Sequence, residues 1–147
     1  MAVDIDLVLA ALDSSEESTD AAEYALAIAE KYDADVHMLH VLDQRIRRGL
    51  DTGDLTADTI AAHQQSLVAT IHEQLPEGVN CTSSTVLGYS THRLGQTPGS
   101  VTLDAAEELD ADFLVIPRVT SSGATDEVLG KAALYVLEYA SQPVLSV

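Results

Sequence analysis

The chain has 147 residues, 46% of them hydrophobic, and this length suits a single domain with one buried core. Its 24 acidic residues against 7 lysines and arginines give a formal net charge of -17, which argues against nucleic acid and anionic membranes as partners. No apolar run is long enough to span a membrane, and the first residues lack the regions of a secretion signal. We therefore expect one domain over residues 1–147, located in the cytoplasm.

The acidic surplus has an unusual composition. Only two lysines occur, Lys31 and Lys131, and aspartate outnumbers glutamate. Dissolved salt screens the repulsion between acidic groups, so this composition indicates a halophilic host with a salt-rich cytosol.

Strand patterns and helix patterns alternate along the chain. Five short apolar or alternating segments are expected to be strands: residues 5–12, 36–42, 81–87, 113–116 and 144–147. Pro143, directly before the last of them, suits the start of an edge strand.

Four segments between these strands show helical spacing of apolar residues. The expected buried stripes are Ala22, Ala25, Leu26 and Ala29; Leu67, Val68, Ile71 and Leu75; Val101, Ala105, Ala106 and Leu109; and Ala133, Val136, Leu137 and Ala140. Ser14 and Glu17 fit the capping box that begins the first helix. Residues 43–55 and 88–98 are expected to be loops.

This alternation predicts right-handed βαβ crossovers and a five-stranded parallel sheet with helices on both faces. The expected fold is a three-layer α/β/α, Rossmann-like sandwich. Ligands bind such sheets at the carboxyl ends of the strands, so residues 13–15, 41–43 and 117–131 are expected to converge there.

Asp13 follows the first strand and precedes a helix. A carboxylate in that position can accept hydrogen bonds from an adenine amino group or a ribose hydroxyl, while backbone N–H groups at a helix start bind phosphate. Asp13 and Ser14 can equally form only a turn and a helix cap.

Residues 9–18 read L-A-A-L-D-S-S-E-E-S, an apolar strand end followed by a D-S-S-x-x-S turn. This segment resembles the first strand and D-G-S-x-x-S turn of the universal stress protein family. Residues 25–41, ending M-L-H-V, and residues 105–116, A-A-E-E-L-D-A-D-F-L-V-I, resemble later elements, and residues 129–147 end with the family's P-V-L-x-V. The resemblance implies an adenine nucleotide alpha hydrolase-like fold, a regulatory role in stress response, and a homodimer formed through the last strand, residues 144–147.

Family members that bind ATP carry a glycine pattern after the fourth strand, and this chain departs from it. Aligned on Gly130, the two earlier glycine positions hold Pro117 and Thr120, and the final hydroxyl position holds Lys131. Proline has no N–H for a phosphate, and a threonine side chain prevents close approach of the backbone.

Two of the seven cations, Arg118 and Lys131, lie in this loop and offer charge to an anion. We therefore predict a site for ATP or AMP, with Asp13 and Val41 at the adenosine and the later residues around phosphate. Its residues are Asp13, Ser14, Val41, Pro117, Arg118, Thr120, Gly130, Lys131 and Ala132.

The sequence gives little indication of metal binding, disulfide formation or catalysis. His37 and His40 are three apart on a strand, so they point to opposite faces and cannot share a metal, while a single cysteine, Cys81, excludes an intrachain disulfide. No catalytic motif is recognisable, so an enzyme is not expected. Three functions remain open: a nucleotide-sensing regulator, a homodimeric interaction module without nucleotide, and a weak ATPase.

Overall fold

A computed structural model describes residues 3–13, 17–42, 44–88, 96–118 and 132–147, with the side chains of residues 17, 44, 45 and 47 left aside. Strands and helices follow one another in the described chain almost without interruption. They are β1 (Leu7–Leu12), α1 (Glu17–Tyr32), β2 (Asp35–Leu42), α2 (Gln44–Thr52), α3 (Ala57–Glu73), β3 (Cys81–Leu87), α4 (Pro98–Glu108), β4 (Phe113–Ile116), α5 (Ala132–Tyr139) and β5 (Val144–Ser146).

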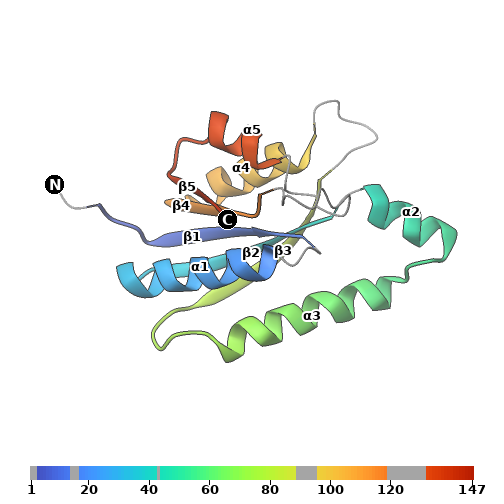
Figure 1. The fold of residues 1–147 in the computed structure, drawn as a ribbon, viewed down its shortest axis with the longest axis horizontal. Coiled ribbons are helices and arrows are strands. Elements are labelled where there is room, and N and C mark those ends of the chain that lie inside the picture. The colour runs from blue at the N-terminus through green and yellow to red at the C-terminus, as the bar shows by residue number, and fades with distance from the viewer. Residues whose placement is uncertain (1–2, 14–16, 43, 89–95, 119–131) are drawn as a thin grey trace.

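The five strands form one parallel sheet in the order β3-β2-β1-β4-β5. After β3 the chain returns across the sheet, and β4 pairs with β1 on the side opposite β2. The direction in which successive strands are added therefore reverses between β1 and β4. All strands run the same way, and their carboxyl ends face the side of the molecule where α2 lies (Figure 1). This architecture confirms the predicted five-stranded α/β fold.

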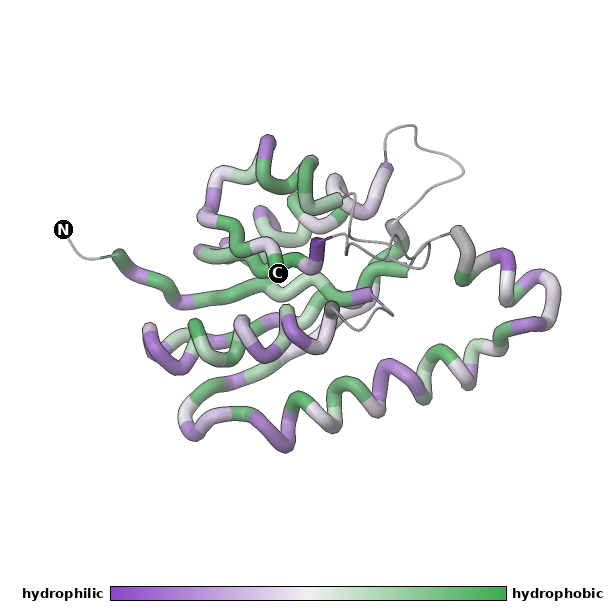
Figure 2. The backbone as a smooth tube through the Cα atoms, viewed as in Figure 1, coloured by the Kyte–Doolittle hydropathy of each residue, from purple (hydrophilic) through white to green (hydrophobic). Residues whose placement is uncertain are grey.

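Side chains of β1 divide between two cores because successive residues of a strand point to opposite faces. One face packs against α1 and part of α3, and the other against α4 and α5. Strands β1 and β4 are apolar throughout, whereas α1 and α3 alternate between apolar and polar residues (Figure 2). The β1 residues in the first core are Val8, Ala10 and Leu12, and those in the second are Leu9 and Ala11.

The amino ends of the strands are fixed by side-chain hydrogen bonds. One carboxylate oxygen of Asp112 accepts from the backbone N–H groups of Asp6 (2.9 Å) and Leu7 (3.1 Å). The carboxylate of Asp35 accepts from the backbone N–H of Asn80 at 3.3 Å. These contacts hold β4 to β1 and β3 to β2 at the end of the sheet that lies away from the expected ligand site.

Two predictions about the helices are wrong. Residues 43–55 are not all loop, because Gln44–Thr52 forms α2, in which Ile46 is half-buried. Leu109 and Leu137 do not belong to buried stripes, since 39% and 50% of their side-chain surfaces are exposed. Leu109 is the C-cap of α4, where the chain leaves the helix, and Leu137 lies on the outer side of α5.

Helix α3 covers the sheet incompletely. Of its 17 residues only Ile71 is buried, and Leu67 packs against the core only in part. Val68 also lies half-buried on this helix. Of the helices in the described part of the chain, none is long and apolar enough to cross a membrane.

Candidate functional site

The members of the predicted site that the structure describes lie at or just after the carboxyl ends of β1, β2 and β4 and at the start of α5. Asp13 directly follows β1, Val41 lies in β2, and both side chains are buried against the same cavity. Pro117 is buried and Arg118 is exposed just after β4, while Ala132 is buried at the start of α5; these three do not line that cavity. Ser14, Thr120, Gly130 and Lys131 lie outside the described residues.

Ser18 holds Asp13 in place by two hydrogen bonds. The backbone N–H of Asp13 donates to the Ser18 hydroxyl oxygen at 2.7 Å, and that hydroxyl donates to Oδ1 of Asp13 at 2.8 Å. Ser18 is 1% exposed in the first turn of α1, so the pair ties the end of β1 to the start of α1. The predicted capping box of Ser14 with Glu17 lies outside the described structure, because it involves Ser14 and the side chain of Glu17.

Val41 is positioned by the close approach of Gly88 to the end of β2. The Gly88 N–H donates to the Leu42 carbonyl at 2.6 Å. A Cβ on Gly88 would lie 2.9 Å from Cγ1 of Val41 and 3.2 Å from the Leu42 carbonyl oxygen, too near for either contact to persist unchanged. The absence of a side chain at Gly88 therefore preserves the backbone of β2 where a ligand would meet it.

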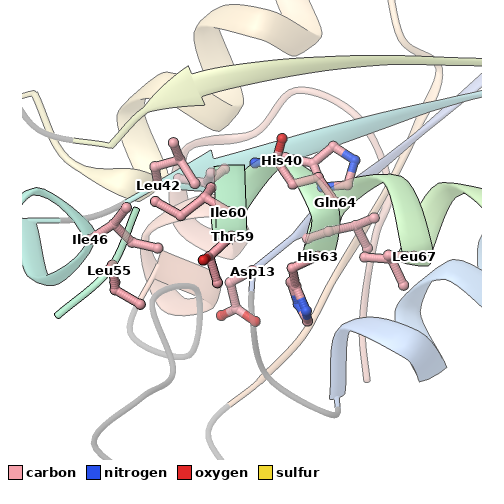
Figure 3. Close-up of a pocket in the computed structure, with 12 residues that line it drawn as sticks. Asp13, His40, Leu42, Ile46, Leu55, Thr59, Ile60, His63, Gln64 and Leu67 are labelled. Carbon is pink, nitrogen blue, oxygen red and sulfur yellow. The ribbon is translucent and has the colours of Figure 1, made fainter. Parts of the chain in front are cut away.

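A cavity of about 300 Å³ opens beside Asp13 and Val41, between the ends of β1 and β2 and the helices α2 and α3. Figure 3 shows the side chains around it, with Ile46 and Leu55 on one side and Leu67 on the other. It exists because α3 leaves that end of the sheet uncovered. Its apolar walls are Leu12, Val41, Leu42, Ile46, Leu55, Ile60 and Leu67.

Five polar residues also line the cavity. They come from the strand ends and from two successive turns of α3, and they are Asp13, His40, Thr59, His63 and Gln64. In Figure 3 the side chains of Asp13 and His63 point to the same side of the cavity. A few polar groups converging on aliphatic walls are typical of a small-molecule site.

His40 is unusual among these polar groups. Its side chain is 6% exposed, and its Nε2 atom has no hydrogen-bond partner within the described structure. His37, on the opposite face of β2, is equally buried but has both ring nitrogens partnered, by the hydroxyl oxygens of Thr82 (2.7 Å) and Ser84 (2.8 Å). The predicted opposite orientation of the two histidines is confirmed by the alternation of β2 between the two cores.

Burial lowers the pKa of His40 from its ordinary value of 6.5, and the neighbouring imidazoles of His63 and His37 lower it further. The pKa of His37 is lowered by burial alone. Both imidazoles therefore favour the neutral form in the folded protein.

This environment predicts a pH-dependent stability. The unfolded chain gains a proton on His40 near pH 6.5, whereas the folded chain resists it, so the free energy of unfolding falls as the pH drops below that value. We expect His40→Leu to gain stability relative to the wild type as urea unfolding is moved from about pH 8 to about pH 5. A constant difference between the two proteins across that range would contradict this assignment.

The phosphate half of the predicted site is only partly described. Arg118 donates its backbone N–H to the Val147 carbonyl at 2.7 Å, which extends the pairing of β4 with β5 and leaves the guanidinium exposed. Pro117 beside it has no N–H to offer, as the sequence indicates. In the described chain no cluster of three or more metal-ligating side chains occurs.

Most of the cavity-lining residues were not predicted from the sequence. The prediction named Asp13 and Val41 as site residues but none of those supplied by α2 and α3. Residues 43–55 were expected to be loop, and the helix that contains Leu67 was predicted only for its buried stripe. His40 was considered only as a metal ligand. The one sequence signal was that the polar stretch 43–55 contains three apolar residues, two of which, Ile46 and Leu55, line the cavity.

The fold is that of a Rossmann-like α/β protein, with a cavity at the carboxyl ends of β1 and β2, where such sheets bind ligands. The sequence profile described as the universal stress protein family matches residues 5–147. The chain therefore belongs to the universal stress protein family.

Individual relatives agree with this assignment. A universal stress protein of Methanocaldococcus jannaschii is 27% identical over 139 residues, 92% of this chain and 77% of the relative. Among solved structures, UspA of Lactobacillus plantarum has a TM-score of 0.75 at 19% identity, with 99% of both chains covered.

Two similar structures contain an adenine nucleotide. A universal stress protein in complex with cAMP has a TM-score of 0.67 at 20% identity, covering 98% of this chain and 97% of that one. The universal stress protein of Archaeoglobus fulgidus in complex with dAMP has a TM-score of 0.61 at 20% identity, covering 99% and 98%.

Proposed function

We propose that this protein is a regulatory, non-catalytic universal stress protein that binds an adenine nucleotide at the carboxyl ends of β1 and β2. The observation that carries the proposal is the cavity that Asp13 and Val41 share, since these are the two residues expected at the adenosine. The complexes of similar folds with cAMP and dAMP support the same ligand class.

The ligand's orientation follows from the chemistry of the two residues. The Asp13 carboxylate, fixed by Ser18, is an acceptor for ribose hydroxyls, and the end of β2 offers backbone groups to a base edge. Phosphate would extend toward Arg118, an exposed cation just after β4, the strand that neighbours β1. Gly130, Lys131 and Thr120 remain predicted contacts for that phosphate.

Native mass spectrometry of protein purified without nucleotide, followed by calorimetric titration with AMP and ATP, tests the proposal. We expect one ligand per chain, either retained on purification or bound with measurable heat. Because the net charge is -17, titrations belong in concentrated KCl as well as in dilute buffer. An empty protein that gives no heat with either nucleotide would contradict the proposal and favour an interaction module.

We propose that the protein is located in a salt-rich cytoplasm. The excess of 24 acidic over 7 basic side chains supports that setting, because high salt screens the repulsion that this charge produces.

A homodimer through β5 is the second proposal, and the position of this strand favours it. β5 lies at the edge of the sheet, and all three of its residues are half-buried within one chain, leaving backbone groups and side chains for a partner strand. A second copy related by a twofold axis is the simplest partner.

We expect Leu145→Glu to convert the dimer into monomers in sedimentation experiments, because a carboxylate there opposes its own copy across the axis. Leu134→Glu on α5, a residue 74% exposed, is the matched control and leaves the dimer intact. Circular dichroism confirms that both variants are folded. A folded Leu145→Glu protein that still sediments as a dimer would place the interface elsewhere.

A further inference from the structure

Strand β3 forms an edge of the sheet that nothing in its own sequence protects. It lies outermost beside β2, and no strand that the structure describes pairs with its outer side. Proteins usually protect such edges by short strands, charged side chains or proline. β5, at the opposite edge, has three residues and follows Pro143, whereas β3 has seven residues without a charge or a proline. β3 therefore keeps the capacity to pair with a further strand.

The hydrogen bonds between β3 and β2 show which backbone groups remain at the outer side. The Val36 N–H donates to the Asn80 carbonyl at 2.9 Å, and the Gly88 N–H donates to the Leu42 carbonyl at 2.6 Å. In a parallel ladder, every second residue of a strand bonds to a given neighbour. The even-numbered residues of β3 therefore face β2, and the odd-numbered ones direct their backbone groups outward. The outward residues before the end of the strand are Cys81, Ser83 and Thr85.

The surface around this edge is uncharged, in a chain of which 21% of the residues are charged. Residues 59–72 of α3 and residues 78–88, which include β3, contain no aspartate, glutamate, lysine or arginine. All residues from 82 to 85 are exposed. Small residues of α3 are exposed as well, namely Ala61, Ala62, Ser66 and Ala69. Two copies that each carry a net charge of -17 repel one another least where such an uncharged surface meets its own copy.

A groove of about 410 Å³ separates α3 from the outer part of the sheet. It is lined by residues of α3, among them Ala61, Gln65 and Ala69, and by Ser83 and Thr85 of β3. α3 lies on the same side of the sheet as α1 and covers this edge incompletely (Figure 1). The groove therefore leaves room for the side chains of a strand that lies beside β3.

We propose that β3 and the exposed face of α3 form a self-association surface, through which a second copy of the chain extends the sheet by antiparallel β3–β3 pairing. A twofold axis perpendicular to the sheet at Ser83 gives this pairing. The Ser83 N–H of each copy donates to the Ser83 carbonyl of the other, and Cys81 exchanges hydrogen bonds with Thr85 of the second copy in the same way.

The side chains suit this symmetry. No charges face each other across the paired strands, because β3 has none. The same axis brings both α3 helices to one face of the joined sheet, where their small exposed residues allow close approach. Its position at the edge opposite β5 lets this surface join dimers formed through β5 into larger assemblies. The inference goes beyond the proposed function, since it requires neither bound nucleotide nor the β5 interface.

Sedimentation of Leu145→Glu isolates this surface, because that variant lacks the interface proposed at β5. We expect monomers in dilute buffer and dimers in concentrated KCl, where salt screens the repulsion between the copies. Adding Ser83→Pro is expected to keep the protein monomeric in both, because proline removes an outward N–H but no hydrogen bond to β2. Adding Ser83→Ala instead keeps that N–H and, as the matched control, leaves the dimer. Circular dichroism confirms that each variant is folded.

A charge on α3 tests the helical part of the surface independently. Ala62→Glu in the Leu145→Glu background is expected to raise the monomer–dimer dissociation constant about tenfold, because a carboxylate would have to be buried between the two helices. Ala27→Glu, at an exposed position of α1, changes the net charge equally and is expected to leave the constant unchanged.

The outcomes separate this inference from the two earlier proposals. Leu145→Glu protein that stays monomeric in concentrated KCl would overturn the inference and leave the β5 interface standing. Equal association of folded Ser83→Pro and Ser83→Ala proteins would overturn it too. Dimers of Leu145→Glu in dilute buffer that Ser83→Pro dissociates would support it and overturn the β5 interface instead. AMP titration of Ser83→Pro, expected to match the wild type, keeps the nucleotide proposal apart.

Discussion

Asp13→Ala is expected to lower AMP affinity by about 10- to 150-fold, the effect of losing a hydrogen bond to a charged acceptor. The carboxylate lies at the mouth of the cavity beside Val41, and Ser18 holds one of its oxygens at 2.8 Å. It is therefore preorganised, and little entropy is lost when a ribose hydroxyl donates to it. Titration calorimetry of the wild type and the variant measures the change directly.

Ser18→Ala tests how much of the AMP affinity depends on the hydrogen bonds by which Ser18 holds the Asp13 carboxylate in place. This variant keeps Asp13 but loses both hydrogen bonds between the two residues, so we expect a smaller loss of affinity and a lower free energy of unfolding. In the double variant the two losses should not add, because Ser18 acts through Asp13. If Asp13→Ala binds AMP as tightly as the wild type, Asp13 is only a turn residue and the ligand lies elsewhere.

Leu39→Ala is expected to lower the free energy of unfolding by about 2–5 kcal/mol. Leu39 is completely buried in β2, between β1 and β3, where it packs in the core formed with α4 and α5. The substitution removes buried apolar surface and leaves a void that the close-packed strands cannot fill. Urea unfolding followed by circular dichroism gives the value.

Leu137→Ala is the matched control, with the same change of side chain at a residue that is 50% exposed on α5. Its cost should stay within about 0.5 kcal/mol, as for most surface substitutions. Equal losses for Leu39 and Leu137 would mean that α5 packs against the sheet differently from the structure described above.

Most of the sheet could be predicted from the sequence because β1 and β4 are pure apolar runs and β2 is apolar apart from Asp35 and two histidines. Burial on both faces of a parallel sheet demands this composition, and short runs such as Phe113–Ile116 have few alternatives. Helix stripes were predicted less well at their ends. Leu109 and Leu137 keep the helical period of their neighbours, but periodicity alone does not reveal where the covered surface stops.

The cavity could be predicted only in part. The general rule for parallel sheets locates Asp13 and Val41 at the ligand edge, and the structure brings them together. The rest depends on tertiary structure: α2 is a polar segment whose helix brings Ile46 to the cavity, and α3 stands off the sheet end. Spacing predicts which face His40 occupies, but only the packing around it shows that Nε2 has no partner.

Mapping backbone amide NMR shifts during an AMP titration tests the central claim most directly, because it locates the ligand residue by residue. We predict that the largest changes occur at Asp13, at Val41 and Leu42, and at Thr59 and His63 across the cavity, while the amino ends of the strands near Asp35 and Asp112 stay unchanged. Changes confined to another surface, or no changes at saturating AMP, would contradict an adenine-nucleotide site at the carboxyl ends of β1 and β2.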